Sequence, residues 1–149
     1  MNLKYMDLAF KEAEKAFKQG EVPVGAIIVK NDKIIAKAFN KKEKSHCSIN
    51  HAEILAIKQA SKRLKNWRLE ECDIYVTLEP CPMCASAIKQ SRIKNVYSAV
   101  SNKNPLNNDL ILKIFEKDTT NTSVNFFNDL NIERSETLLQ KFFANKRKK

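Results

Sequence analysis

The sequence is poor in glycine and proline. Its 149 residues include two glycines and four prolines, whereas 43% of them are hydrophobic and 30% are charged. Disordered and collagen-like chains are rich in glycine or proline, so this composition argues against both classes. A chain of this length can bury a substantial core, and we expect residues 1–149 to form one globular domain.

Long apolar runs are also missing. No stretch approaches the roughly 20 apolar residues that span a bilayer. Residues 1–17 carry charges throughout, where a signal peptide would have an apolar centre. We therefore expect a cytoplasmic protein with no membrane partner. In that reducing compartment, the four cysteines are better candidates for metal ligands or core residues than for disulfides.

Acidic residues are in the minority. The chain has 27 lysines and arginines against 17 aspartates and glutamates, which gives a net charge of +10. Such a charge attracts a polyanion such as nucleic acid. A lysine-rich composition that serves only solubility would give the same number, so charge alone leaves both interpretations open.

The apolar periodicity predicts an α/β domain, in which a strand, helix and strand in sequence form a parallel pair with a right-handed crossover. We expect Asn50 to cap one helix and Pro80 to open the next. The predicted elements are a helix over 6–17, a hairpin within 24–39 that turns at Asn31 and Asp32, a helix over 51–64, a strand over 73–78, a helix over 80–93, a strand over 95–100, a loop over 101–109, a short helix over 110–117, a strand over 123–127 and a helix over 133–149.

A histidine and a glutamate share the start of the helix predicted over 51–64. His51 and Glu53 stand two residues apart in the segment NHAEI, and His-x-Glu by itself is common by chance. Further along, Cys81 and Cys84 form a Cys-x-x-Cys motif where a helix follows a strand. Two thiolates at this spacing can bind one ion, and a helix N-terminus stabilises thiolates.

Together these residues predict a catalytic zinc site. His51, Cys81 and Cys84 would leave a tetrahedral zinc with one open position for water, as in catalytic and not structural sites. Glu53 could then carry the protons of that water without binding the metal. His-x-Glu followed by Pro-Cys-x-x-Cys is the signature of zinc-dependent nucleobase deaminases.

Each of these residues has an ordinary explanation when taken alone. His51 could be a hydrogen-bonded surface or core residue, Glu53 a first-turn acid, and the two cysteines a redox pair. A fourth ligand from His46 or Cys47 is conceivable, but we favour a solvated pair in a polar loop, because a closed site could not activate water. Cys72 is expected to be a small buried residue.

Beyond the zinc motif, the sequence resembles the bacterial tRNA-specific adenosine deaminases of the cytidine-deaminase-like superfamily. The resemblance covers most of the chain. It is carried by EVPVGAIIV at 21–29, AFN at 38–40, HAEILAI at 51–57, YVTLEPCPMCASAI at 75–88 and SRI at 91–93.

The resemblance implies a three-layer fold in which helices flank a central mixed five-stranded sheet. It also implies a homodimer whose interface helps to shape the active sites. It implies one zinc ion per chain and the hydrolytic conversion of the wobble adenosine of an arginine tRNA to inosine. In the family's pattern, Glu53 matches the proton shuttle and Asn40 an asparagine that binds the target adenine. Asn40 could equally close a loop at a strand end. From the resemblance we expect Pro23, Val24 and Ala52 to form walls of the substrate pocket. All three could instead be residues of the hydrophobic core.

The segment that would contact RNA is less sharply encoded. The family ends in an aromatic, basic helix near the RNA, and here the end of the chain holds Phe142, Phe143, Lys146 and Arg147. The alternative is that both phenylalanines pack inward and the basic residues face solvent. The basic end continues with Lys148 and Lys149.

One loop departs from the family's pattern. The usual Asp-x-Lys-x-Gly-Ala is replaced by residues 101–106, SNKNPL, which keep Lys103 but neither the acid nor the glycine. The altered loop leaves open which tRNA is the substrate and which nucleotides must surround the target base. Competing hypotheses are a deaminase of a free base or nucleoside such as cytosine, cytidine or guanine, a non-catalytic RNA-binding protein with a structural zinc, and a redox protein.

Overall fold

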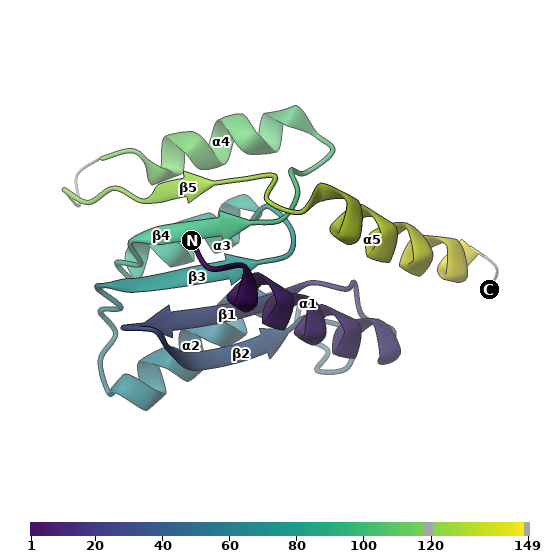
Figure 1. The fold of residues 1–149 in the computed structure, drawn as a ribbon, viewed down its shortest axis with the longest axis horizontal. Coiled ribbons are helices and arrows are strands. Elements are labelled where there is room, and N and C mark those ends of the chain that lie inside the picture. Colours follow the sequence, from purple (N-terminus) through teal and green to yellow (C-terminus); the bar gives the residue numbers. More distant parts are fainter. Residues whose placement is uncertain (118–120, 148–149) are drawn as a thin grey trace.

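A five-stranded mixed sheet forms the centre of the molecule in the computed structural model, which describes residues 1–117 and 121–147. The strand order is β2-β1-β3-β4-β5, and β1 runs antiparallel to both β2 and β3. Strands β3, β4 and β5 run parallel (Figure 1). The strands are β1 (Gly25–Lys30), β2 (Lys33–Phe39), β3 (Cys72–Val76), β4 (Asn95–Ser98) and β5 (Asn125–Phe127).

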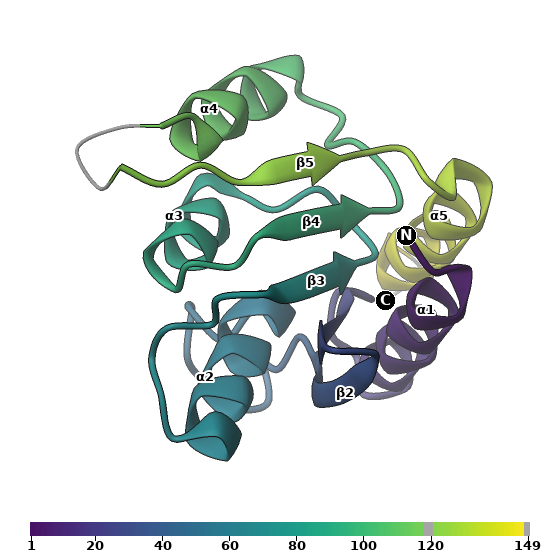
Figure 2. The same cartoon turned by 60° about the vertical axis from the view of Figure 1, so that its left-hand side comes forward.

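Helices cover both faces of the sheet, which confirms the predicted three-layer architecture. Helices α2, α3 and α4 lie on one side, and α1 and α5 lie on the other (Figure 2). The helices are α1 (Leu3–Lys18), α2 (Ala52–Leu64), α3 (Pro82–Gln90), α4 (Pro105–Phe115) and α5 (Ile132–Arg147). No helix among the described residues is both long and apolar enough to cross a bilayer.

The β1–β2 hairpin forms as predicted. Lys30 pairs with Lys33, so the turn consists of two residues, Asn31 and Asp32. Their φ angles of 49° and 58° lie in the left-handed region, which asparagine and aspartate tolerate and which a type I′ turn requires. The polar dipeptide between two apolar runs therefore determined the start of the sheet.

Helix α1 packs very closely on β1 at Gly25. A Cβ atom at this position would lie 2.1 Å from the Ala9 carbonyl oxygen and 2.6 Å from the Ala13 nitrogen. Both are backbone atoms of α1 and cannot rotate away. Glycine is required here because the helix backbone occupies the space of a side chain.

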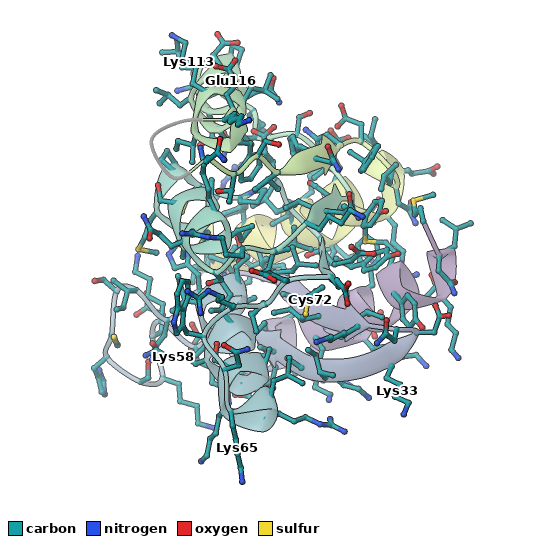
Figure 3. All side chains as sticks on the ribbon, turned by 90° about the vertical axis from the view of Figure 1, so that its left-hand side faces the viewer. Lys33, Lys58, Lys65, Cys72, Lys113 and Glu116 are labelled. Atoms are coloured by element: carbon teal, nitrogen blue, oxygen red, sulfur yellow. The ribbon has the colours of Figure 1, made fainter. Side chains whose placement is uncertain are left out.

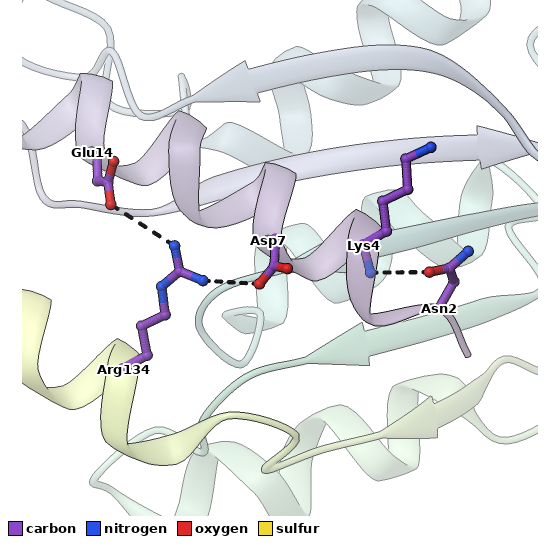
Figure 4. Close-up of polar contacts among 5 residues, drawn as sticks. All are labelled: Asn2, Lys4, Asp7, Glu14 and Arg134. Carbon is purple, nitrogen blue, oxygen red and sulfur yellow. Dashed lines mark hydrogen bonds and ion pairs between the residues drawn. The ribbon is translucent and has the colours of Figure 1, made fainter.

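Helix α5 is attached to α1 through Arg134. Its guanidinium lies 2.9 Å from an Asp7 carboxylate oxygen and 3.9 Å from one of Glu14 (Figure 4). The same group covers the ring of Phe10. The start of α1 is capped by Asn2, whose side chain accepts from the Lys4 backbone nitrogen. The contact between α1 and α5 joins the two ends of the chain on one face of the sheet.

Basic side chains are spread over the molecule. Lys33, Lys58, Lys65 and Lys113 extend into solvent, whereas Cys72 is fully buried on β3 as predicted (Figure 3).

Several predicted helix boundaries are wrong, and three helix starts are informative. The N-cap of α2 is His51 and not Asn50, and α3 begins at Pro82 and not at Pro80, with Cys81 as its N-cap. Helix α4 begins at Pro105, so half of the predicted loop is helical; Asn104 caps it by accepting from the Leu106 nitrogen. In both proline cases, the ring at the first helical position suits a residue whose N–H has no partner within the helix.

Candidate active site

The N-termini of α2 and α3 bring the three predicted metal ligands together. The Nδ1 atom of His51 lies 3.8 Å from the Cys81 sulfur and 3.6 Å from the Cys84 sulfur. All three ligand atoms lie within 4.8 Å of one another. A tetrahedral zinc with ordinary bond lengths separates nitrogen and sulfur ligands by about 3.6 Å, so this donor set fits zinc.

The two thiols have opposite pKa shifts because they are hydrogen-bonded to each other. The pKa of Cys81 is lowered to about 4, chiefly because the Cys84 thiol donates a hydrogen bond to it. The pKa of Cys84 is raised for the same reason, and burial adds to the effect. Zinc requires both sulfurs as thiolates, so binding must displace the remaining proton.

Glu53 lies on the first turn of α2, buried beside the three ligands but outside their group. Its side chain is only 4% exposed. Burial raises the pKa of this carboxyl to about 7. A group that gains and loses a proton near neutral pH suits general acid–base catalysis.

A cavity of about 240 Å³ opens in front of these residues. Its wall comes from several separate segments, and both acidic and basic side chains reach it. The lining residues are Glu21, Val22, Val24, Asn40, Lys42, Glu43, His51, Glu53, Leu78, Glu79, Cys81, Asn102 and Lys146.

Of the four predicted substrate contacts, Asn40 and Val24 line the cavity, whereas Pro23 and Ala52 are buried and are not part of its lining. Asn40 also closes the loop between β2 and α2. Its Oδ1 accepts from the Ala52 backbone nitrogen at 2.8 Å, and its Nδ2 donates to the Val22 carbonyl at 3.1 Å. Asn40 thus supplies the cap of α2 that His51 does not provide, because the His51 ring faces the cysteines.

The predicted RNA contacts separate into two groups. Lys146 lines the cavity, and Phe143 is 45% exposed, as a side chain that stacks on a base must be. Phe142 is 4% exposed, because its ring packs edge-on against Phe17 of α1, 6.3 Å between centroids. The inward packing that we considered for both phenylalanines therefore holds for Phe142. Lys103 and Arg147 are exposed outside the cavity, and Lys148 and Lys149 lie outside the described residues.

The loop pair His46 and Cys47 does not join the site. The group of ligand atoms found among the described residues comprises only His51, Cys81 and Cys84. His46 lies at the surface, at the end of a turn over 42–46. The Glu21 carboxylate accepts hydrogen bonds from the backbone nitrogens of Glu43 and Lys44 in this turn, at 2.9 and 2.8 Å.

Among the lining residues that sequence reasoning missed are four charged ones, Glu21, Lys42, Glu43 and Glu79. Glu21 and Glu79 are almost fully buried, with exposures of 1% and 2%. Glu79 stands two residues before Cys81, and an acid so close to a metal ligand was a signal that could have been followed.

Comparison with known proteins supports the geometry. Residues 1–100 match the family model of the cytidine and deoxycytidylate deaminase zinc-binding region. The tRNA-specific adenosine deaminase of Bacillus subtilis strain 168 is 43% identical over 146 residues, which cover 97% of this chain and 90% of that protein.

Two solved structures resemble this one over nearly their whole length. A structure from studies of A-to-I editing by tRNA:A34 deaminases has a TM-score of 0.84 at 31% identity, covering 93% of this chain and 100% of that one. A guanine deaminase from Bacillus subtilis has a TM-score of 0.67 at 29% identity, covering 97% and 95%. The fold, the ligand set and the sequence similarity agree, and the chain belongs to the zinc-dependent cytidine and deoxycytidylate deaminase family.

Proposed function

We propose that the protein hydrolyses the 6-amino group of the wobble adenosine in a tRNA anticodon, with an arginine tRNA as substrate, and so produces inosine. The observation that carries this proposal is the 43% identity over almost the whole chain to a tRNA-specific adenosine deaminase. The guanine deaminase is less similar in both sequence and structure.

The residues at the metal site have distinct roles in this reaction. His51, Cys81 and Cys84 would hold the zinc, which would lower the pKa of a water molecule and so supply a nucleophile for C6 of adenine. Glu53 accepts a proton from that water and delivers it to the purine ring nitrogen N1. It then passes the second proton to the departing amine, which leaves as ammonia. Water supplies both the oxygen of inosine and the protons.

The wall of the cavity suits a nucleotide within an RNA chain. Lys42 and Lys146 bring ammonium groups to the lining from two distant segments. A nucleotide that leaves its stack to enter the cavity carries a phosphate on each side, and these cations can contact them. Asn40, Val24 and the neighbouring Pro23 and Ala52 would enclose the base, with Phe143, Lys103 and Arg147 as outer RNA contacts.

The assembly that we propose is a cytoplasmic homodimer. Leu106 and Leu110 are exposed apolar residues one turn apart on α4, and a second copy of the chain would remove them from water. Sedimentation at micromolar concentration tests this: Leu110→Glu should yield monomers where the parent protein forms dimers. A monomeric parent protein would contradict the proposal.

The proposed reaction is tested by incubating the zinc-loaded protein with an arginine-tRNA anticodon stem-loop that carries a wobble adenosine. Nucleoside mass spectrometry then measures inosine, with free adenosine, cytidine and guanine in parallel reactions. A stem-loop with guanosine at the wobble position is the matched control. Inosine formed only in the adenosine stem-loop supports the proposal, and turnover of a free base or nucleoside with an unchanged stem-loop would refute it.

The second candidate function is deamination of a free base or nucleoside. The replaced loop at 101–106 favours it, because Asn102 of this loop lines the cavity. A purely structural zinc is a weaker hypothesis, because a structural site does not need a proton carrier, and Glu53 would then be a buried carboxyl beside the metal with no chemical role.

A further inference from the structure

Glu79 is a buried carboxylate that the proposed chemistry does not use. It follows β3, precedes Cys81 by two residues and is 2% exposed, yet it lines the active-site cavity. An unpaired carboxylate in such a place is costly, so its surroundings must satisfy it.

Four hydrogen bonds from neutral donors do so. Oε1 accepts from the side-chain amides of Asn108 and Asn128, each at 2.8 Å. Oε2 accepts from the Asn107 amide at 2.8 Å and from the Asn102 backbone nitrogen at 3.2 Å. A carboxylate has about four lone-pair sites, so these four donors occupy its accepting capacity. Glu79 therefore has no free lone pair for a substrate proton and cannot act as a second general base.

The four donors come from three separate segments of the chain. At this position the three segments are not paired as strands. Asn102 belongs to the loop after β4, Asn107 and Asn108 to the first turns of α4, and Asn128 to the segment after β5. The Asn107 amide also donates to the Pro80 carbonyl at 3.1 Å, and the Asn128 amide donates to Ser101 Oγ at 2.8 Å. Glu79 thus connects the chain before Cys81 to the cavity wall formed by Asn102.

The charge of Glu79 adds to this arrangement. Helix α4 has no acidic residue in its own first turn. The carboxylate of Glu79, bound to Asn107 and Asn108, supplies a negative charge at the helix N-terminus, where the helix dipole favours one.

We propose that Glu79 is a positioning residue that sets substrate specificity: its hydrogen bonds to Asn102, Asn107, Asn108 and Asn128 fix the cavity wall against the metal-binding segment. This wall includes the loop in which the chain departs from its family's pattern, so Glu79 determines how the altered loop receives the nucleotides next to the target. The proposal rests on the proposed function only for the identity of the substrate.

The test compares Glu79→Gln with a matched control, Asn125→Ala, in the zinc-loaded full-length protein. The amide of glutamine would direct an N–H group at the N–H donors of the asparagines. The Asn125 amide, by contrast, donates to Asn95 Oδ1, outside the network. Because the wall binds substrate and does not touch the reacting atoms, Glu79→Gln should raise KM for the stem-loop about tenfold or more, with kcat within about threefold and one zinc per chain. Asn125→Ala should leave all three quantities unchanged.

Two further measurements separate positioning from general damage. In Glu79→Gln combined with Asn107→Asp, the new amide can donate to the new carboxylate, so KM should fall below that of either single variant. Amide hydrogen exchange should increase at 101–108 in Glu79→Gln and stay unchanged in α1. If Glu79→Gln does not fold, Asn107→Ala and Asn128→Ala, which each remove one donor, should each raise KM.

The outcomes distinguish this proposal from the proposed function. A parent protein that deaminates only a free base or nucleoside refutes the tRNA function, and the same KM series is then measured on that substrate. Parental KM and parental exchange at 101–108 in Glu79→Gln would overturn the role of Glu79, as would strictly additive effects in the double variant.

Discussion

The asparagine at the end of β2 gives the sharpest prediction of stability. Asn40→Ala removes two hydrogen bonds, one to the Ala52 nitrogen at 2.8 Å and one from Asn40 Nδ2 to the Val22 carbonyl at 3.1 Å. Ala52 is completely buried, whereas Val22 is half-buried and lines the cavity. At about 1–2 kcal/mol for the unsatisfied Ala52 N–H and less than about 1 kcal/mol for the Val22 carbonyl, we expect the free energy of unfolding to fall by about 1–3 kcal/mol.

Urea denaturation followed by circular dichroism measures this difference. With a slope of about 2 kcal/mol per molar urea, the midpoint should fall by roughly 0.5–1.5 M. All variants are compared with one zinc per chain and the same free zinc concentration, because bound metal itself adds stability. The single tryptophan, Trp67, is half-exposed and far from Asn40 in sequence, so its fluorescence is the weaker probe.

Two variants control for the loss of an amide in general. Asn125→Ala removes an exposed asparagine that donates to Asn95, and its effect should stay below about 0.5 kcal/mol. Asn40→Asp keeps an acceptor for the Ala52 nitrogen but loses the donor to Val22, so it should fall between the parent and Asn40→Ala. A midpoint for Asn40→Ala within error of the parent protein would refute the capping role.

Four further changes test the site and the fold. Glu53→Gln should retain one zinc by metal analysis and lower kcat by about 10²–10⁴-fold, and activity within tenfold of the parent protein would contradict its role as proton carrier. Cys84→Ser should lose zinc in a competition assay with a chelator, whereas parental affinity would exclude Cys84 as a ligand. Gly25→Ala should lower the free energy of unfolding by at least about 1–3 kcal/mol in urea, because its Cβ meets backbone atoms of α1; an unshifted midpoint would show that α1 moves freely. Lys146→Ala should weaken stem-loop binding by fluorescence anisotropy and reduce the slope of log affinity against log salt by about 0.7, and an unchanged slope would exclude a phosphate contact.

The features that were predictable from the sequence have local signals. The β1–β2 hairpin follows from a polar dipeptide between apolar runs, and the zinc ligands follow from His-x-Glu and Cys-x-x-Cys placed at helix starts. The residues of each of these motifs are close in sequence, and for the zinc site it is the combination of the two motifs, 30 positions apart, that carries the information.

The features that were not predictable depend on partners far away in the sequence. Asn50 is a good N-cap by residue type, but α2 begins one residue later and takes its cap from Asn40, 12 positions before Ala52. Phe142 and Phe143 are indistinguishable by composition, and only the packing of α5 on α1 decides which of them is buried. The partners of Glu79 lie 23 to 49 residues after it, beyond any motif.

The position of α5 has a consequence for how the protein is made. All three zinc ligands lie between His51 and Cys84, so a ribosome translates them before it translates Lys146, the last residue of the cavity wall. A nascent chain therefore holds every metal ligand while its substrate cavity is still incomplete. The synthesis of 62 residues, from Ala85 to Lys146, separates the last metal ligand from this part of the cavity wall, so a chain that took up zinc at that stage would still lack Lys146.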